Sequence, residues 1–515
     1  MPRALQWVLG GAAAMFAASA SQASPCDRVS GLDIAGVRIL RATAVGPEAP
    51  LLPPLPSAKP LTTSFCRVEG IIEREIGFEI WLPAGERWNH RLLVGGVGGQ
   101  AGSLNYYELV RGVGRGYAAA STDTGHKATD RHWLLGPADR AANYAERANH
   151  LLAMKAKAII SEVYGQAIQH AFFVGCSGGG RQALTEVQRF PADFDGVIAG
   201  APGVNTPEMS ARRMWEMQRH SEWGSFMGPA QWKLIADAAV RSCDSQDGVR
   251  DGVIDDPTRC RFDPRTLRCD KALARGCLTD RQLAAALTIY SPLHDENGRQ
   301  IDQGLLPGIQ VQAVPLPEPF APGPPYLAVA LFGDGVHRDA NWDARQFRIA
   351  SDLPAIDRVM NLHADDPDIS AFVKGGGKLI LYQGWADPLV APQTTVAYYR
   401  AVQRRLGKRA EQAVRLFMVP GVEHCRGGAG PDLFGGAGGD APQQDADHDM
   451  LSALEAWVQR GVRPEQIIAV RRAATGVIDR TRPLCSFPMH ARYLGRGSTD
   501  QATNFVCEAK PLRKS

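Results

Sequence analysis

The chain has 515 residues, of which 57 are basic and 54 acidic, and its formal net charge is +3. This near balance, without a dense Lys/Arg run, argues against nucleic acid and anionic membrane surfaces as partners. With 44% hydrophobic residues the chain can bury a large core, either in one domain with an insertion or in two to three domains.

The N-terminus predicts a secretory signal peptide over residues 1–23. Arg3 supplies the positive start, Ala4–Ala20 is apolar and alanine-rich, and Ser21-Gln22-Ala23 offers a cleavage site of small residues. A membrane anchor is the alternative, but this apolar stretch is short and contains Gln6. We therefore expect a secreted or periplasmic protein that does not bind a membrane.

Ten cysteines lie in the predicted mature chain, and this even number in an oxidising compartment suggests five disulfides. Proximity in the sequence favours Cys243–Cys260, Cys269–Cys277 and Cys485–Cys507. Counting leaves the pairing of the remaining four open. These are Cys26, Cys66, Cys176 and Cys425.

Strand-like and helix-like patterns alternate from about residue 67 to 200 and resume near residue 378. This alternation predicts the α/β class, with a mostly parallel sheet covered by helices. The expected strands are Gly77–Leu82, Arg91–Val94, Tyr117–Ser121, Ala171–Val174, Val197–Ala199, Lys378–Tyr382 and Val414–Val419, and the expected helices include Asn143–Tyr164 and Asp449–Arg460. The glycine-rich segment Gly427–Gly439 is expected to be a surface loop.

The segment Gly175-Cys176-Ser177-Gly178-Gly179 is the clearest motif of the chain. It lies between a predicted strand and the helix-like Arg181–Val187, as does the G-x-S-x-G nucleophile elbow of α/β-hydrolases. Glycines are needed there because a Cβ would crowd the turn. The amides at the start of the following helix can stabilise an oxyanion. The motif predicts Ser177 as a nucleophile on an α/β-hydrolase fold.

Such a serine needs a base and an acid, which follow it in the order Ser, Asp, His in α/β-hydrolases. Asp387 follows the expected strand ending at Tyr382, and His424 follows the strand ending at Val419. Both therefore lie at the carboxyl edge of the predicted sheet. Eleven other histidines exist, but His424 is singled out by its neighbour Cys425.

Cys176 precedes Ser177 just as Cys425 follows His424, so a disulfide between them would tie nucleophile to base. A disulfide holds its two Cα atoms about 4.4–6.8 Å apart. Two alternatives are a catalytic Cys176 thiolate and a zinc site made of both cysteines and His424. The thiolate would point away from the exposed site, and the zinc set lacks C-x-x-C spacing.

The oxyanion hole is expected to combine the Gly178 amide with one from the glycine-rich loop Gly95–Gly99. Gly98 is the best candidate in that loop, followed by Gly99. The loop lacks the G-x-G-x-x-G spacing of a dinucleotide site, so nucleotide binding is not expected.

Residues 205–350 differ in character, with tryptophans, methionines, prolines, four cysteines and little strand alternation. This predicts a lid domain inserted into the hydrolase, whose catalytic domain comprises residues 24–204 and 351–515. The lid carries an acidic loop that starts at Cys243. A solvated loop is one interpretation, but the bracketing Cys243 and Cys260 indicate a rigid unit that favours a structural calcium ion. The expected ligands are Asp244, Asp247 and Asp251 with the carbonyls of Val249 and Val253.

Together these stretches resemble the tannase and feruloyl esterase family of secreted α/β-hydrolases. The resemblance extends over nearly all of the mature chain. It is carried by residues 175–182, 190–202, 116–126, 244–254 and 420–425.

The resemblance implies the roles of the matching residues. It makes Ser177, Asp387 and His424 the triad, Cys176–Cys425 the catalytic-site disulfide and the acidic loop a calcium site. It also implies the pairs Cys26–Cys66, Cys243–Cys260, Cys269–Cys277 and Cys485–Cys507.

The expected activity is that of a secreted serine esterase acting on small esters of hydroxycinnamic or hydroxybenzoic acids. A first alternative is a terephthalate monoester such as mono(2-hydroxyethyl) terephthalate, whose hydrolase belongs to the same family. A second is a non-catalytic, calcium-stabilised secreted binding protein. The acyl group and the oligomeric state stay open at this point.

Overall fold

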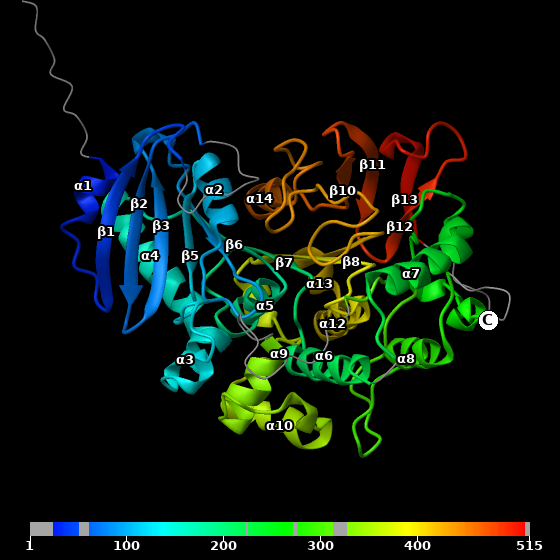
Figure 1. The fold of residues 1–515 in the computed structure, drawn as a ribbon. Helices are drawn as coiled ribbons and strands as arrows, with labels where there is room; N and C mark the ends of the chain where they lie inside the picture. The colour runs from blue at the N-terminus through cyan, green and yellow to red at the C-terminus, as the bar shows by residue number, and fades with distance from the viewer. Residues whose placement is uncertain (1–23, 51–60, 223–224, 271–275, 313–326, 510–515) are drawn as a thin grey trace, which may run out of the picture.

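The computed structural model describes residues 24–50, 61–222, 225–270, 276–312 and 327–509. The predicted signal peptide over residues 1–23 lies outside these residues. A twisted sheet runs through the middle of the molecule, with helices on both faces (Figure 1). None of the helices in these ranges is both long and apolar enough to cross a membrane.

The main sheet confirms the predicted α/β class. In spatial order the strands described are β1 (Val37–Val45), β2 (Phe65–Ile72), β3 (Ile76–Pro83), β5 (Ala118–Thr122), β4 (Arg91–Gly95), β6 (His170–Cys176), β7 (Gly196–Gly200), β8 (Lys378–Gly384) and β9 (Val414–Val419). Along this order, neighbouring strands from β1 to β5 are antiparallel, and those from β5 to β9 are parallel.

The parallel strands are apolar along their whole length because both faces of the sheet are covered. In β6, Ala171 and Phe173 pack on one face, whereas Phe172 and Val174 pack on the other. This is the alternation expected of a strand, whose successive side chains point to opposite faces. The first face is covered by α4 (Ala148–Tyr164), α5 (Gly178–Arg189) and α12 (Pro392–Leu406), and the second by α2 (Tyr106–Gly114) and α14 (Met450–Arg460).

Two expected elements differ in detail. The predicted helix over Asn143–Tyr164 begins with a π-helical turn at Asn143–Arg147, and α4 starts at Ala148. The glycine-rich segment Gly427–Gly439 is not simply a surface loop, since Phe434 is buried and packs edge-on against Tyr382. The small residues of this segment allow it to pass close to the sheet, so here they do not indicate an exposed loop.

Between the adjacent strands β7 and β8 the chain leaves the sheet for an excursion of mostly helical structure. Its described helices are α6 (Thr206–His220), α7 (Pro229–Cys243), α8 (Asp280–Tyr290), α9 (Leu327–Val329), α10 (Ile349–Val359) and α11 (Ser370–Lys374). Of these, α6, α8, α9 and α10 gather on one side of the molecule, below the sheet in Figure 1. The predicted lid boundaries at 205 and 350 fall within this excursion and stay a prediction.

The C-terminal region forms two antiparallel strand pairs at the end of the molecule opposite β1 (Figure 1). Both pairs were missed in the sequence. They are β10 (Gln466–Arg472) with β11 (Ile478–Cys485), and β12 (Met489–Tyr493) with β13 (Phe505–Ala509). The remaining helices are α1 (Pro25–Val29), α3 (Asp139–Ala142) and α13 (Lys408–Ala413).

Five disulfides join the ten cysteines, in the pairs that the sequence and its family resemblance suggested. They are Cys26–Cys66, Cys176–Cys425, Cys243–Cys260, Cys269–Cys277 and Cys485–Cys507.

Candidate active site

Ser177 lies in a strained turn between β6 and α5. Its φ of 63° and ψ of −122° are unusual for a residue with a side chain, and such strain is common at functional sites. A Cβ at Gly175 would lie 2.3 Å from the Gly179 carbonyl oxygen, and one at Gly180 would lie 2.4 Å from that of Gly200. Gly175 of the motif and Gly180 just after it are therefore required by close backbone contacts, and the turn presents Ser177 at the carboxyl edge of the sheet.

The Cys176–Cys425 disulfide brings the segment of His424 next to that of Ser177. Its two Cα atoms are 6.0 Å apart, although the cysteines are separated by 249 positions in the chain. As half-cystines, neither sulfur is available as a thiolate nucleophile or a zinc ligand. Ser177 Oγ and the His424 ring make no direct hydrogen bond within the described ranges, and such contacts often tighten only when substrate binds.

Asp387 is fully buried and oriented by four donors. Its Oδ1 accepts hydrogen bonds from the backbone N–H groups of Leu389 (2.8 Å) and Val390 (3.0 Å). Its Oδ2 accepts from Gln383 Nε2 at 2.9 Å and lies 2.9 Å from His424 Nδ1. This pairing places the proton of a neutral His424 on Nδ1 and leaves Nε2 free to accept a proton, which is the tautomer that a serine hydrolase needs.

Removing the Cys176–Cys425 bridge is expected to lower kcat/KM by about 100-fold, because a shift of roughly 1 Å between reacting groups has that effect. The measurement is ester hydrolysis by a Cys176→Ser/Cys425→Ser variant. The matched control is Cys269→Ser/Cys277→Ser, whose bridge spans 8 positions in the insertion. Equal losses in both variants would show that disulfides matter here for stability and not for site geometry.

The loop of Gly98 lies directly against the serine. A Cβ at Gly98 would lie 3.6 Å from Ser177 Cβ, and one at Gly178 would lie 3.1 Å from the Gly99 nitrogen. The structure thus brings the two glycine segments predicted for an oxyanion hole together around Ser177. A side chain at Gly178 would press on this contact, whereas a Cβ at Gly98 would lie at ordinary van der Waals distance.

Three side chains that the sequence did not single out hold this loop. Gln182 makes two hydrogen bonds with the Val97 backbone. Its Oε1 accepts from the Val97 N–H at 2.9 Å, and its Nε2 donates to the Val97 carbonyl at 3.1 Å. Asn105 Nδ2 donates to the Gly96 carbonyl at 2.7 Å, and the Tyr144 hydroxyl donates to the Gly99 carbonyl at 2.8 Å. Gln182 follows the elbow motif and was a detectable candidate, whereas nothing in the sequence pointed to the other two.

Ser177 opens into a cavity of about 600 Å³ with a mostly apolar wall. That volume is typical of a small-molecule site. One part of the wall comes from Gly99, Gln100 and Pro388, and another from residues of the insertion such as Met209 and Leu305. The insertion therefore builds much of the surface that a substrate would contact.

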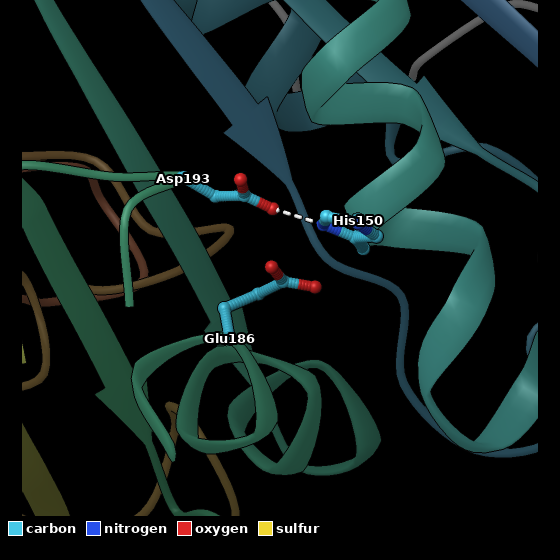
Figure 2. Close-up of side chains that lie close together, drawn as sticks. All are labelled: His150, Glu186 and Asp193. Atoms are coloured by element: carbon cyan, nitrogen blue, oxygen red, sulfur yellow. Dashed lines mark hydrogen bonds and ion pairs between the residues drawn. The ribbon is translucent and has the colours of Figure 1, made fainter. Parts of the chain in front are cut away.

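A buried polar cluster supports α5, the helix that starts beside Ser177 (Figure 2). Asp193 Oδ2 lies 2.6 Å from Nδ1 of His150, whose ring stacks on Phe190. Glu186 points toward this pair, and its Oε2 is buried without a partner. Burial, reinforced by the Asp193 carboxylate, raises the pKa of Glu186 well above its usual range. No motif in the sequence indicated this cluster.

A Glu186→Gln variant is expected to melt at a higher temperature than the wild type at pH 8. Because the pKa of Glu186 is raised in the folded state, the folded protein binds the proton more tightly than the unfolded chain does. Glu186 therefore lowers the free energy of unfolding as the pH rises above the pKa that this side chain has in the unfolded chain. Glutamine keeps the neutral shape, and the difference should vanish near pH 4. Scanning calorimetry at both pH values measures it, with the exposed Glu162 of α4 (Glu162→Gln) as control. A wild type more stable than the variant at pH 8 would contradict the prediction.

The acidic loop of the insertion packs against the C-terminal region. Asp251 is ion-paired with Arg482, and Asp244 accepts hydrogen bonds from the N–H groups of Asp251 and Gly252. A small cavity of about 20 Å³, enough for one water-sized particle, is lined by Asp247, Asp251, Val253 and Asp255 together with residues of the C-terminal region. Burial raises the pKa of Asp247 to about 6, and Asp255 and Asp251 add to the effect. The three carboxylates on this wall are oxygen ligands of the kind that a hard cation such as calcium prefers, although Arg482, on the same wall, already pairs with Asp251.

The chain is similar in sequence to known esterases. A family model described as tannase and feruloyl esterase matches residues 61–317 and 326–508. An uncharacterized esterase of Xanthomonas campestris pv. campestris is 35% identical, with 96% of this chain and 92% of that protein covered. A probable feruloyl esterase B-1 of Aspergillus terreus is 30% identical, with 86% of each covered.

Solved structures are similar over almost the whole chain. Feruloyl esterase B from Aspergillus oryzae superposes with a TM-score of 0.86 at 25% identity, covering 94% of this chain and all of that one. A tannin acyl hydrolase from Aspergillus niger, with a TM-score of 0.74 at 23% identity and 94% of each chain covered, shares the fold. These similarities confirm the predicted α/β-hydrolase fold.

Proposed function

This chain belongs to the tannase and feruloyl esterase family of carboxylic ester hydrolases, and from that membership we propose that it is a secreted serine esterase for esters of hydroxycinnamic or hydroxybenzoic acids. One observation carries the proposal most directly. Ser177, in its strained turn, opens into a mostly apolar cavity and is joined through a disulfide to the segment of an Asp387–His424 pair. That arrangement suits acyl transfer from a flat aromatic acid.

The reaction proceeds in two acyl-transfer steps. His424, oriented by Asp387, takes the proton of Ser177 Oγ as this oxygen attacks the ester carbonyl carbon. The amides of Gly178 and the Gly98–Gly99 loop stabilise the oxyanion, and collapse of the intermediate expels the alcohol with the proton from His424. Water, deprotonated by His424, then attacks the acyl-enzyme and releases the aromatic acid.

Two features of the chain support the proposed secretion. Five disulfides are typical of oxidising compartments and rare in reducing ones. The apolar, alanine-rich start of the chain has the composition of a signal peptide.

Hydrolysis of matched methyl esters tests the proposed function. Methyl ferulate, methyl gallate and methyl butyrate are compared with mono(2-hydroxyethyl) terephthalate, and kcat/KM is measured for each. We expect the hydroxylated aromatic esters to be hydrolysed most efficiently. A serine-directed phosphonate should label Ser177, as located by peptide mass spectrometry. A preference for the terephthalate ester would replace the hydroxylated aromatic acids by terephthalate as the assigned acyl group. A folded protein that hydrolyses none of the four esters would favour a binding function.

The acidic loop is proposed to hold one structural calcium ion. Asp244, Asp247 and Asp251 with the carbonyls of Val249 and Val253 are the proposed ligands, and Asp255 lies beside them. The ion would lock the loop onto the C-terminal region and neutralise crowded carboxylates. It would lie outside the reaction.

Calcium removal is expected to lower the melting temperature by several degrees, by mass action on a folded-state site. Calorimetry of the holoprotein with and without a chelator measures the shift, and elemental analysis counts the ion. An Asp247→Asn variant should lose both the ion and the chelator effect, whereas Asp237→Asn, in the exposed Lys233–Asp237 pair, should keep both. A full complement of calcium in Asp247→Asn would contradict the assignment.

A further inference from the structure

A second, larger cavity adjoins the catalytic cavity. It has a volume of about 870 Å³, and Gln303, Gln393 and Ala397 line both cavities. A substrate that occupies the catalytic cavity and reaches past these residues would enter the second one. We call it the basic cavity, for the arginines described below.

Helix α12 runs from one cavity to the other. Gln393, Ala397 and Arg400 are spaced by four and three residues, which places them on one face of the helix. At 1.5 Å per residue, Arg400 lies about 10 Å along the helix from Gln393. The guanidinium therefore lies about two helical turns beyond Gln393 in the wall that the two cavities share, on the side of the second cavity.

Three exposed arginines line the basic cavity without an ion-pair partner in the described parts of the chain. They are Arg259, Arg261 and Arg400, and the last lies over the Phe487 ring at 5.6 Å. Two carboxylates, Asp255 and Asp256, also line the wall, and Arg482 is already paired with Asp251. The three unpaired arginines therefore carry more positive charge than the two carboxylates on the same wall can neutralise.

We propose that the basic cavity binds a carboxylate carried by the alcohol half of the ester. The preferred substrates would be aromatic esters of a sugar acid or another hydroxy acid, with the acyl group in the apolar cavity. Guanidinium groups suit this role because their planar donors match a carboxylate with two parallel hydrogen bonds. The inference rests on the proposed esterase function and specifies its alcohol.

Two matched substrates test the inference, namely the feruloyl ester of 6-hydroxyhexanoic acid and the methyl ester of the same compound. They differ in one charge at the far end of the alcohol. The wild-type enzyme is expected to show about tenfold higher kcat/KM for the free acid, mainly through a lower KM. Raising the salt concentration should reduce this preference, since screening weakens exposed charge pairs.

Arg400→Gln is expected to remove most of the preference while leaving kcat/KM for the methyl ester unchanged. Arg259→Gln/Arg261→Gln provides a second variant on another part of the wall, and Arg409→Gln, an exposed arginine of α13 outside both cavities, is the matched control. Equal wild-type kcat/KM for the two substrates, or an equal loss in Arg409→Gln, would overturn the inference. Failure to hydrolyse either substrate or methyl ferulate would instead overturn the proposed function.

Discussion

Replacing Ser177 by alanine is expected to lower kcat/KM for aromatic esters by at least about 10,000-fold, with the fold intact. In the proposed mechanism, the Ser177 hydroxyl forms the acyl-enzyme. The two residues next to Ser177 in the turn are a half-cystine and a glycine, so neither can replace it. The elbow conformation is set by the surrounding glycines and backbone hydrogen bonds, such as that from Ser177 N to the Gly200 carbonyl at 3.0 Å.

Steady-state hydrolysis of methyl ferulate measures this loss, and calorimetry shows whether the variant is folded. Ser351→Ala, at an exposed serine of α10, is the matched control and should retain the wild-type rate. A folded Ser177→Ala variant that keeps more than a hundredth of the wild-type rate would exclude Ser177 as the nucleophile.

Asp387→Asn is expected to lower kcat by about 10,000-fold with a smaller change in KM. In the variant, the backbone N–H groups of Leu389 and Val390 keep the side-chain carbonyl oxygen of Asn at the position of Oδ1. The new amide nitrogen therefore takes the position of Oδ2. It then faces Nδ1 of His424, which must accept rather than donate. The ring changes tautomer, its proton moves to Nε2, and His424 can no longer take the proton of Ser177.

The control for this variant is a second buried aspartate that pairs with a histidine. Asp334 lies 3.0 Å from Nδ1 of His132, and neither residue lines the catalytic cavity. Asp334→Asn should affect stability and leave kcat within severalfold of the wild type. Comparable kcat losses in both variants would mean that the Asp387 effect is structural.

The placement of the candidate site residues was predictable because it depends on short segments. The elbow requires glycines at fixed positions around Ser177, and these leave a motif in the sequence. Asp387 and His424 could be placed because each follows an apolar strand, and parallel strands end at the same sheet edge. The Cys176–Cys425 pairing was predictable from its position beside two residues that must meet, although 249 positions separate them.

Other features depended on contacts between distant segments. Gln182 and Tyr144 support the Gly98 loop, and Gln383 supports Asp387, but a single polar residue has no periodic pattern that announces its partner. The antiparallel strands β1, β2 and β10 to β13 were also missed in the sequence. Of these, β1, β10 and β12 are partly exposed, and such strands leave a weak hydrophobic signal.

By itself the sequence determined the α/β-hydrolase class, the serine and its two expected partners, because turn sterics and strand periodicity act locally. The tertiary structure alone decided the shape of the catalytic cavity, the buried Glu186 cluster and the basic cavity beside α12. Each of these is formed by side chains far apart in the chain, whose proximity follows from packing and not from any spacing along it.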